Sequence, residues 1–500
     1  MHKELVAAVD LGSNSFRLQV GRIVNDQIYP LDGLKEPVRL AAGLGEDKCL
    51  DDASQGRALL ALARFGERRS LFQPHRVRAV ATNTLRVAKN APEFIAKAEM
   101  ALGFPIEVIA GREEARLIYV GVAHTLPEPH RQQLVVDIGG GSTEFIIGKS
   151  FQPLELESLY MGCVSYTLRY FPNDRIKKRG FEDAQLAARR ELEAIADGYR
   201  RQGWELAVGS SGTAKSLRDI LVSNGMSERG ITRSGLEELK QVLIRNGSLD
   251  KLGLKGIKAD RLPVLPGGLA IMMSIFDAFG LDEMQFSDGA LRLGVLYDLL
   301  GRYHHHDLRD ATAEAFADRY RVDRKQASLV AETALYLLEQ LDEATKDPDN
   351  LDRRFLHWAA ILHEVGISVA HSSYHKHSAY ILANADMPGF SRMDQGRLAR
   401  LVLGHRGKLA RLSDIDPESP DWQLVACLRL AVVFHRARTE RCCPPIAIER
   451  VGHGFALTAD ADWLHDLPLT AAALNDEVAQ WNAIGHPLQL TVSERGSQAG

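Results

Sequence analysis

The sequence predicts an α/β protein with two similar lobes around a cleft, followed by an all-α domain and a small α/β C-terminal domain. Strand-like and helix-like segments alternate through about residue 300, which is typical of α/β units. Between residues 307 and 438 strand signals almost vanish, and apolar residues recur at helical spacing. The third observation is an internal repeat of a glycine-containing turn, which implies two related lobes.

The clearest copy of the repeat covers residues 135–148, where a glycine turn joins two segments of strand length and composition. Gly139–Gly141 removes every Cβ from the turn, so backbone N–H groups can approach an anion closely. Asp137 and Glu144 place carboxylates at the mouth of the turn. An amide cradle beside two carboxylates suits a phosphate chain that carries a divalent cation; a plain glycine-rich hairpin is the alternative.

The same pattern occurs near the N-terminus. Val9–Ser15 aligns with Val136–Ser142 at a constant offset, and each copy lies between two apolar strands. The same offset carries Arg17 onto Glu144, so one copy offers a cation where the other offers a carboxylate.

The bulk properties of the 500-residue chain are ordinary for a globular protein, with 45% hydrophobic and 25% charged residues. A net charge of −4 excludes an overall basic protein that coats nucleic acid, and no nucleic acid is expected as a partner. Neither a signal-peptide pattern nor a membrane-spanning apolar run is expected, which favours a cytoplasmic protein and leaves peripheral membrane association open. The five cysteines lack zinc-site spacing, and Cys442–Cys443 is interpreted as reduced thiols rather than a redox pair.

In the first lobe, a helix is expected over residues 52–72, and a buried strand over 77–81 leads into the polar segment Thr82–Arg86. Polar side chains at the carboxyl end of a strand are where α/β proteins bind ligands. Arg86 is therefore a candidate phosphate clamp, and a surface arginine in a salt bridge is the equally weighted alternative.

A strand over residues 106–109 precedes a helix that carries Glu113 and Glu114 in its first turn. Carboxylates there complement the helix dipole, which is sufficient explanation for one of the two. A helix N-terminus also attracts anions, and a carboxylate beside it can orient a water molecule. Both interpretations carry equal weight at this point.

The second lobe contains a charged amphipathic helix over residues 183–201, a strand ending in the turn Gly209–Thr213, and an apolar helix through Phe279. A further strand–turn–helix segment follows at 284–294. The basic run Arg175–Arg179 is interpreted as solvated surface.

The C-terminal part begins after His304–His306, which is interpreted as linker. The helical block is rich in histidine, including His357, His363, His371, His375, His377 and His405. Beyond it, strands are expected over 446–449, 455–458 and 488–492, with a helix over 466–482 and a disordered tail over 493–500.

Several motifs together make the chain resemble the exopolyphosphatase/guanosine pentaphosphate phosphatase family, within the actin- and sugar-kinase-like superfamily. They are Ala81–Arg86, Gly111–Arg116, Ser287–Gly294, Leu362–Gly366 and His375–Leu382. The resemblance covers essentially the whole chain and is strongest to bacterial exopolyphosphatases. It implies an actin- and ribonuclease-H-like lobe I at 1–124, a matching lobe II at 125–303, an HD-like helical domain at 304–442 and a small domain at 443–500.

The resemblance also implies an activity, namely processive hydrolysis of the terminal phosphoanhydride of polyphosphate. Glu114 would take the proton of the attacking water, and Arg86 would neutralise charge on the transferred group. A divalent cation, Mg²⁺ or another, would lie beside Asp137, Glu144 and Asp10, with K⁺ a candidate activator and a homodimer the expected assembly. The phosphate-binding residues would be Gly12, Ser13, Asn14, Ser15, Arg17, Asn83, Gly139, Gly140, Gly141, Ser142, Ser211, Gly212 and Thr213.

The helical block resembles an HD-type phosphohydrolase domain but has His363–Glu364 where an active site needs His-Asp. The longer glutamate side chain displaces the oxygen from a tight bimetal site, so this domain is expected to be non-catalytic. It would instead offer a path for a long polyanion, lined by His375, Lys376, His377, Arg406 and Lys408. For any single histidine, a core or surface role without a ligand is the stronger interpretation.

Three other functions compete with the exopolyphosphatase hypothesis. Guanosine pentaphosphate presents the same terminal phosphoanhydride and is an alternative or second substrate. A sugar kinase would transfer the phosphate to another acceptor, but no sugar pocket is evident, and Glu114 beside the cleft favours water. A non-catalytic sensor of polyanions would gain nothing from carboxylates beside the phosphate.

Overall fold

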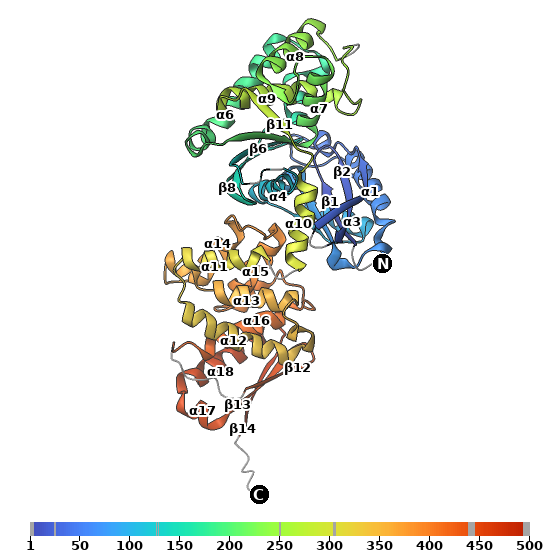
Figure 1. Cartoon of the computed structure of the whole chain (residues 1–500). Coiled ribbons are helices and arrows are strands. Elements are labelled where there is room, and N and C mark those ends of the chain that lie inside the picture. The colour runs from blue at the N-terminus through green and yellow to red at the C-terminus, as the bar shows by residue number, and fades with distance from the viewer. Residues whose placement is uncertain are drawn as a thin grey trace. The chain divides into compact units, whose positions relative to one another are not determined.

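The computed structural model describes residues 5–24, 27–126, 128, 130–249, 252–303, 307–438 and 446–493. The chain divides into two compact units, Met1–His306 and Asp307–Gly500 (Figure 1). The expected linker His304–His306, the pair Cys442–Cys443 and residues 494–500 of the expected tail lie outside the described residues. The expected domain boundary after residue 303 borders the undescribed residues 304–306. The boundary expected after residue 442 falls within the undescribed residues 439–445.

The first sheet of unit 1 has the strand order β3-β2-β1-β4-β5. β1 (Leu5–Leu11), β2 (Phe16–Val24) and β3 (Gln27–Glu36) form an antiparallel meander. β4 (Val77–Ala81) runs parallel to β1, and β5 (Ile106–Val108) runs parallel to β4. The carboxyl ends of β1 and β4 therefore meet at one edge of the sheet, where ligands bind in α/β folds.

The second sheet repeats this arrangement in the order β10-β11-β9-β6-β7-β8. Its strands are β6 (Gln133–Ile138), β7 (Thr143–Lys149), β8 (Gln152–Leu159), β9 (Leu206–Ser210), β10 (Ile231–Thr232) and β11 (Glu283–Phe286). The meander β6-β7-β8 corresponds to β1-β2-β3, and β9 is parallel to β6 as β4 is to β1.

The repeat extends to individual pairs of residues that face each other across neighbouring strands. Asp10 pairs with Arg17 across β1 and β2, and Asp137 pairs with Glu144 across β6 and β7. The irregularities fall at equivalent places too, between Val20 and Gly21 in β2 and between Ile147 and Gly148 in β7. The internal repeat predicted from the sequence is confirmed.

Two helices lie between the sheets and join the lobes: α4 (Gly111–Ala123) and α10 (Leu291–Tyr303) (Figure 1). In the sequence α4 follows the strands of the first lobe, but it packs on β7 and β8 of the second. Conversely, α10 follows the strands of the second lobe and packs on β1 of the first. One apolar core formed by α4 and α10 contains side chains from both sheets, such as Val80 and Val135.

The remaining helices of unit 1 cover the outer faces of the two sheets. The first lobe has α1 (Asp52–Gly66), α2 (Asn83–Val87) and α3 (Ala91–Leu102); the second has α5 (Cys163–Tyr170), α6 (Lys178–Gln202), α7 (Ser211–Ser223), α8 (Arg233–Asn246) and α9 (Leu265–Phe279). The helix expected over 52–72 ends at Gly66, which packs against the backbone of α3, where a Cβ would lie 2.5 Å from Ala101 O.

One stretch of the described residues, Leu262–Phe279, is long and apolar enough to cross a membrane. The sequence-based expectation that no apolar run reaches this length is therefore wrong. Within the fold, 72% of the stretch is buried, and α9 packs in the core of the second lobe. A core helix of this kind passes the same length and composition test, so the stretch is weak evidence for a membrane span.

Unit 2 combines helices with one three-stranded sheet. The helices are α11 (Leu308–Arg319), α12 (Arg324–Leu341), α13 (Leu351–Leu362), α14 (Tyr374–Asn384), α15 (Arg392–Gly404), α16 (Asp421–Phe434), α17 (Ala461–Asp466) and α18 (Pro468–Ala483); the strands are β12 (Ala447–Val451), β13 (Gly454–Asp460) and β14 (Leu488–Ser493). The helix expected over 466–482 is interrupted before Pro468, which starts α18. A single core contains Trp358 of α13 and Trp481 of α18, so the expected helical and C-terminal domains share one interior.

Candidate active site

The two repeated turns line one cavity of about 270 Å³ between the lobes of unit 1. Gly12, Ser13, Asn14 and Ser15 line it from the turn between β1 and β2. Gly139, Gly140 and Ser142 line it from the turn between β6 and β7. The turns approach each other closely, because a Cβ on Gly140 would lie 2.9 Å from the Cβ of Ser13. This contact explains why the sequence needs a glycine in the second turn.

The carbonyl groups of both turns are occupied by neighbouring backbone N–H groups. Ser13 O accepts from Ala41 N at 2.9 Å, and the equivalent Gly140 O accepts from Val164 N at 3.0 Å. Gly139 O likewise accepts from Cys163 N at 2.9 Å, at the start of α5. Because carbonyl oxygens repel phosphate, engaging them elsewhere suits a site for an anion.

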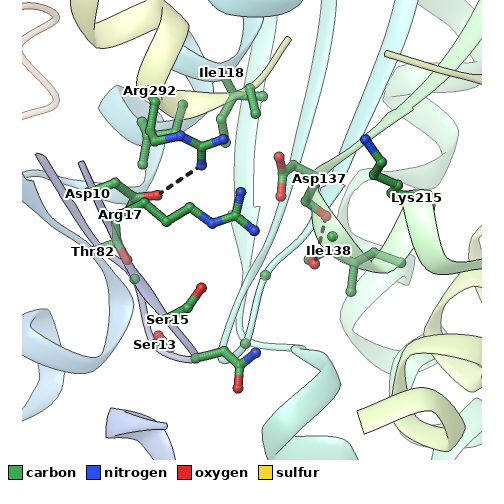
Figure 2. A pocket seen from close by; sticks show the side chains of 18 of the residues that line it. Asp10, Ser13, Ser15, Arg17, Thr82, Ile118, Asp137, Ile138, Lys215 and Arg292 are labelled. Atoms are coloured by element: carbon green, nitrogen blue, oxygen red, sulfur yellow. Dashed lines mark hydrogen bonds and ion pairs between the residues drawn. The ribbon is translucent and has the colours of Figure 1, made fainter. Parts of the chain in front are cut away.

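Four carboxyl groups line the same cavity: Asp10, Glu114, Asp137 and Asp288. The first three are largely buried and come from β1, the first turn of α4 and β6, whereas Asp288 is exposed and pairs with Lys215 at 2.7 Å. Asp137 accepts a hydrogen bond from Ser210 Oγ at the end of β9. Figure 2 shows Asp10 and Asp137 on opposite sides of the cavity, with Arg17 reaching between them.

Burial raises the proton affinity of the first three groups. The pKa of Glu114 is raised to about 7, chiefly by burial; the Arg86 guanidinium opposes the change, and repulsion from Asp10 and Asp137 adds to it. Burial likewise raises the pKa of Asp137 to about 6 and that of Asp10 above its ordinary value. A carboxyl with a pKa near neutrality, in a polar cavity, is matched to proton transfer at physiological pH.

The two glutamates in the first turn of α4 have different partners. Glu113 accepts two hydrogen bonds of 2.8 Å from Arg116 and lies 3.9 Å from Arg78. Glu114 points to the cavity and accepts a hydrogen bond of 2.8 Å from Arg86 Nη1. The two glutamates therefore differ as expected: Glu113 is held in ion pairs that neither interpretation of the motif anticipated, and Glu114 is the one placed to orient a water molecule.

Arg86 does not line the cavity itself but bonds to Glu114, which does. Its guanidinium donates to Glu114 and, at 3.0 Å, to Ile109 O, and only 11% of its side chain is exposed. The salt bridge of one interpretation is present, although it is buried rather than on the surface. The role of phosphate clamp stays a prediction.

Four other expected site residues lie behind the cavity lining rather than in it. Glu144 is 1% exposed and accepts from Ser158 Oγ at 2.8 Å, and Thr213 Oγ1 donates to Ile138 O at 2.9 Å. Gly141 packs on Asn83, where a Cβ would lie 2.5 Å from Asn83 Oδ1. These residues support the turns from behind.

Cations line the cavity beyond the one predicted. Besides Arg17, these are Lys215, Arg261 and Arg292, which sequence reasoning missed as site residues. Arg292, at the start of α10, lies 3.8 Å from Asp10 (Figure 2). Arg292 belongs to the motif Ser287–Gly294, which carries part of the family resemblance, so the sequence offered a way to find it. We find no sequence motif that points to Lys215 or Arg261.

The remaining missed residues of the lining are the carboxylate Asp288 and a set of smaller or apolar residues: Thr82, Ile118, Ile138, Phe286, Ser287, Ala290 and Leu291. Of the second Gly/Ser turn, Ser211 and Gly212 do line the cavity as expected. Gly212 leaves room for Arg261, since a Cβ there would lie 2.2 Å from Arg261 Nη2. Burial, followed by repulsion from Arg292, lowers the pKa of Arg17 to about 10, as expected where cations converge to receive an anion.

The carboxylates suit a metal that takes most of its ligands from elsewhere. No group of three or more His, Cys, Asp or Glu side chains among the described residues is arranged to hold a metal alone. Asp10 and Asp137 nevertheless face a cavity lined by phosphate-binding turns. Mg²⁺ is commonly bound by one or two carboxylates, water and substrate phosphates, and the residues present fit that pattern.

The expected polyanion path in unit 2 is only partly on the surface. Lys376, Arg406 and Lys408 are exposed and His377 is half-buried. His375 is 6% exposed and accepts a hydrogen bond from Arg411 Nη1 at 2.9 Å. Burial and nearby cations lower its pKa to about 4, so it carries no charge for a polyanion at neutral pH.

The two residues of the expected HD-like pair, His363 and Glu364, are also buried. His363 is 1% exposed and its Nδ1 bonds to Ala360 O at 2.7 Å. The carboxylate of Glu364 pairs with Arg438. This pairing is consistent with a site that has lost the metal ligation of an HD enzyme.

Comparison with known proteins assigns the chain to a family. Residues 19–303 match the model of the Ppx/GppA phosphatase family, and residues 308–478 match the model of domain III of Ppx/GppA phosphatases. The chain belongs to the Ppx/GppA phosphatase family. The resemblance inferred from the motifs is confirmed, and members of this family hydrolyse phosphoanhydride bonds.

Individual relatives extend the match along the chain. The chain is 38% identical over 496 residues to a guanosine-5'-triphosphate,3'-diphosphate pyrophosphatase of Aeromonas hydrophila, covering 98% of this chain and 99% of the relative. A solved Ppx/GppA family member from Aquifex aeolicus is 26% identical, with a TM-score of 0.51 over 60% of this chain and 99% of its own. A solved exopolyphosphatase from Cytophaga hutchinsonii shares the fold at 23% identity, with a TM-score of 0.54 over 59% of this chain and 98% of its own.

Proposed function

We propose that Glu114 activates water for attack on the terminal phosphorus of a polyphosphate chain bound between the two turns. The observation that carries this proposal is a buried carboxyl with a pKa of about 7 at the wall of a cavity lined by both anion-binding turns. As a carboxylate, Glu114 accepts the water proton, and the neighbouring Arg86 keeps its side chain oriented through the 2.8 Å bond.

In this proposal the turns hold the phosphate oxygens and the cations balance the charge. Gly12–Ser15 of the first turn and Gly140 and Ser142 of the second supply backbone N–H groups, and Ser211 and Gly212 add the start of α7. Arg17, which reaches into the cavity in Figure 2, neutralises charge on the phosphoryl group. Asn83, Gly141, Thr213 and Glu144 keep the turns in place rather than touch the phosphate.

We further propose Mg²⁺ as the cation held by Asp10 and Asp137. When bound, it would neutralise the developing charge on the phosphate oxygens. Each carboxylate is held ready by a partner, Asp137 by Ser210 and Asp10 by Arg292. Asp10 and Asp137 repel each other when both are ionised. A cation between them would remove this repulsion, which favours its binding.

Guanosine pentaphosphate is the second candidate substrate, and a specific observation favours it. The full-length relative from Aeromonas hydrophila is named for that nucleotide, whereas the polyphosphate preference rested on a histidine-rich surface of which His375 is buried. Both substrates end in the same phosphoanhydride, so one cavity can serve both.

The experiment that tests the function compares kcat/KM of the purified protein for long-chain polyphosphate and guanosine pentaphosphate with Mg²⁺. We expect release of orthophosphate from at least one of them. A parallel incubation with ATP and sugars tests the kinase alternative. Phosphorylated sugar without hydrolysis would refute the proposal, and binding without turnover would favour a sensor.

A further inference from the structure

A buried ion network lies where β4, α4 and α10 meet, outside the cavity lining. Its members are Arg78, Glu107, Glu113, Arg116 and Asp298. Arg78 is 1%, Glu113 3%, Asp298 7% and Arg116 8% exposed at the side chain, whereas Glu107 at the edge is 24% exposed. None of the five lines the cavity, so the network has no direct part in the chemistry.

Asp298 is the member that joins all three elements. Its Oδ2 accepts from Arg78 Nη1 on β4 at 2.7 Å, and its Oδ1 accepts from Arg116 Nη2 on α4. Arg116 in turn holds Glu113 in the first turn of α4 by two bonds of 2.8 Å. Because each oxygen of Asp298 serves a different guanidinium, loss of this one carboxylate weakens both links of α10.

The helices that Asp298 joins each carry a cavity residue at their N-terminal end. α4 carries Glu114, and α10 carries Arg292, which lies 3.8 Å from Asp10. The helices pack without side chains between them at their closest point, since a Cβ on Gly294 would lie 1.7 Å from Leu117 O. A shift of α10 is therefore passed directly to α4 rather than absorbed by intervening side chains.

We propose that Asp298 is a positioning residue that fixes Glu114 on α4 relative to Asp10 and Arg292. This inference rests on the proposed function of Glu114. Asp298 touches neither the cavity nor Glu114, and it acts by clamping α10 to α4 and β4 at once. Reacting groups are sensitive to such placement, because a displacement of about 1 Å can cost about 100-fold in rate.

The test compares two carboxylate-to-amide changes within the same network. Asp298→Asn breaks the link between α10 and its two partners. Glu107→Gln removes another carboxylate of Arg78, whose bonds to it are 3.0 and 3.1 Å, and leaves Asp298 in place. Both variants are assayed on polyphosphate and guanosine pentaphosphate at temperatures well below their melting temperatures.

For Asp298→Asn we expect kcat to fall about 10- to 100-fold and KM to stay within about threefold, because the phosphate-binding turns are intact. The acidic limb of the kcat profile, which Glu114 sets, shifts to lower pH because the network beside α4 loses a negative charge. Glu107→Gln keeps kcat within about twofold and leaves the limb near its wild-type pH, because solvent screens the charge of Glu107 at the exposed edge of the network. Its melting temperature also falls.

Asp298→Glu covers the case in which the asparagine variant does not fold. It retains both ion pairs but lengthens the link by a methylene group, so we expect a folded protein with reduced kcat. Wild-type kcat and an unmoved acidic limb in both Asp298 variants would overturn the proposal. An equal kcat loss in Glu107→Gln would do the same, by showing a merely structural network. Failure of the wild-type protein to hydrolyse either substrate would instead refute the function of the site.

Discussion

The two turns of unit 1 have the same backbone plan and opposite chemistry. Both join the first two strands of an equivalent meander, and both are followed by an irregularity at the equivalent position of the second strand. The residue paired with the turn's aspartate is Arg17 in the first lobe and Glu144 in the second. Arg17 lines the cavity, whereas Glu144 is 1% exposed and bonded to Ser158.

This difference shows how a duplicated anion site becomes asymmetric. A phosphate needs neutralising charge, which Arg17 supplies from one side. A divalent cation needs carboxylates, and Asp137 faces the cavity from the other side. In the proposed mechanism Glu114, which belongs to neither turn, is the proton acceptor between them.

Glu114→Gln removes the proton acceptor and leaves both turns intact. We expect kcat to fall about 10²- to 10⁴-fold, the usual range for loss of a general base. The dissociation constant for substrate should change little, because Glu114 makes no contribution to anion binding. Steady-state kinetics and a binding measurement with the inactive variant check this. Retained turnover would remove Glu114 from its proposed role.

Arg17→Gln removes the cationic feature of the first turn. We expect kcat/KM to fall about 10²-fold, because the lost charge balances the phosphoryl group in the transition state. The Mg²⁺ concentration for half-maximal activity should stay near that of the wild type. A variant that changed the Mg²⁺ requirement but not kcat/KM would show that the two turns do not divide the work as proposed.

Asp137→Asn should stabilise the protein in the absence of divalent cations. Burial raises the pKa of Asp137 to about 6 from an ordinary value of 3.8, so the folded state carries a cost when this group is ionised. The gain is full above pH 6, shrinks as pH falls through 6, and disappears near the unfolded pKa, because folded Asp137 takes up its proton first. We expect about 1–3 kcal/mol at pH 8 by urea unfolding. A destabilised variant at pH 8 would contradict this.

Replacing Lys376, Arg406 and Lys408 together by alanine tests the exposed remainder of the polyanion path in unit 2. We expect KM for long-chain polyphosphate to rise severalfold and KM for guanosine pentaphosphate to stay unchanged, because only a long chain can extend beyond the cavity. Surface charges contribute little each, so the effect should weaken at high salt. Equal KM values of the triple variant and the wild-type protein for long chains would show that this surface binds no polyanion.

Sequence reasoning predicted the backbone of the site better than its side chains. The constant offset between Val9–Ser15 and Val136–Ser142 was enough to predict two equivalent hairpins, because strand pairing follows the hydrophobic pattern. It also brought both turns and Glu114 to one cavity. The third strand of the second meander, β8, was not predicted. The lobe to which α10 packs was not predictable, since its apolar face suits either sheet.

Side-chain direction was harder to predict because tertiary contacts decide it. Glu144 and Thr213 flank the turns in the sequence, yet Ser158 and the backbone of Ile138 hold them behind the cavity. Lys215 and Arg261 come from segments without a recognisable motif and reach the cavity only through the fold. The histidines of unit 2 show the same effect, because His375 is turned inward toward Arg411.

In the proposed mechanism, a water molecule in the cleft attacks the terminal phosphorus of a phosphoanhydride chain. Hydrolysis of polyphosphate by the wild-type protein in ¹⁸O-labelled water, followed by mass spectrometry of the products, tests it directly. The proposed mechanism predicts that each released orthophosphate carries a single ¹⁸O atom and that the shortened chain carries none. Released orthophosphate without the label, or label in the remaining chain, would contradict attack by water at the terminal phosphorus.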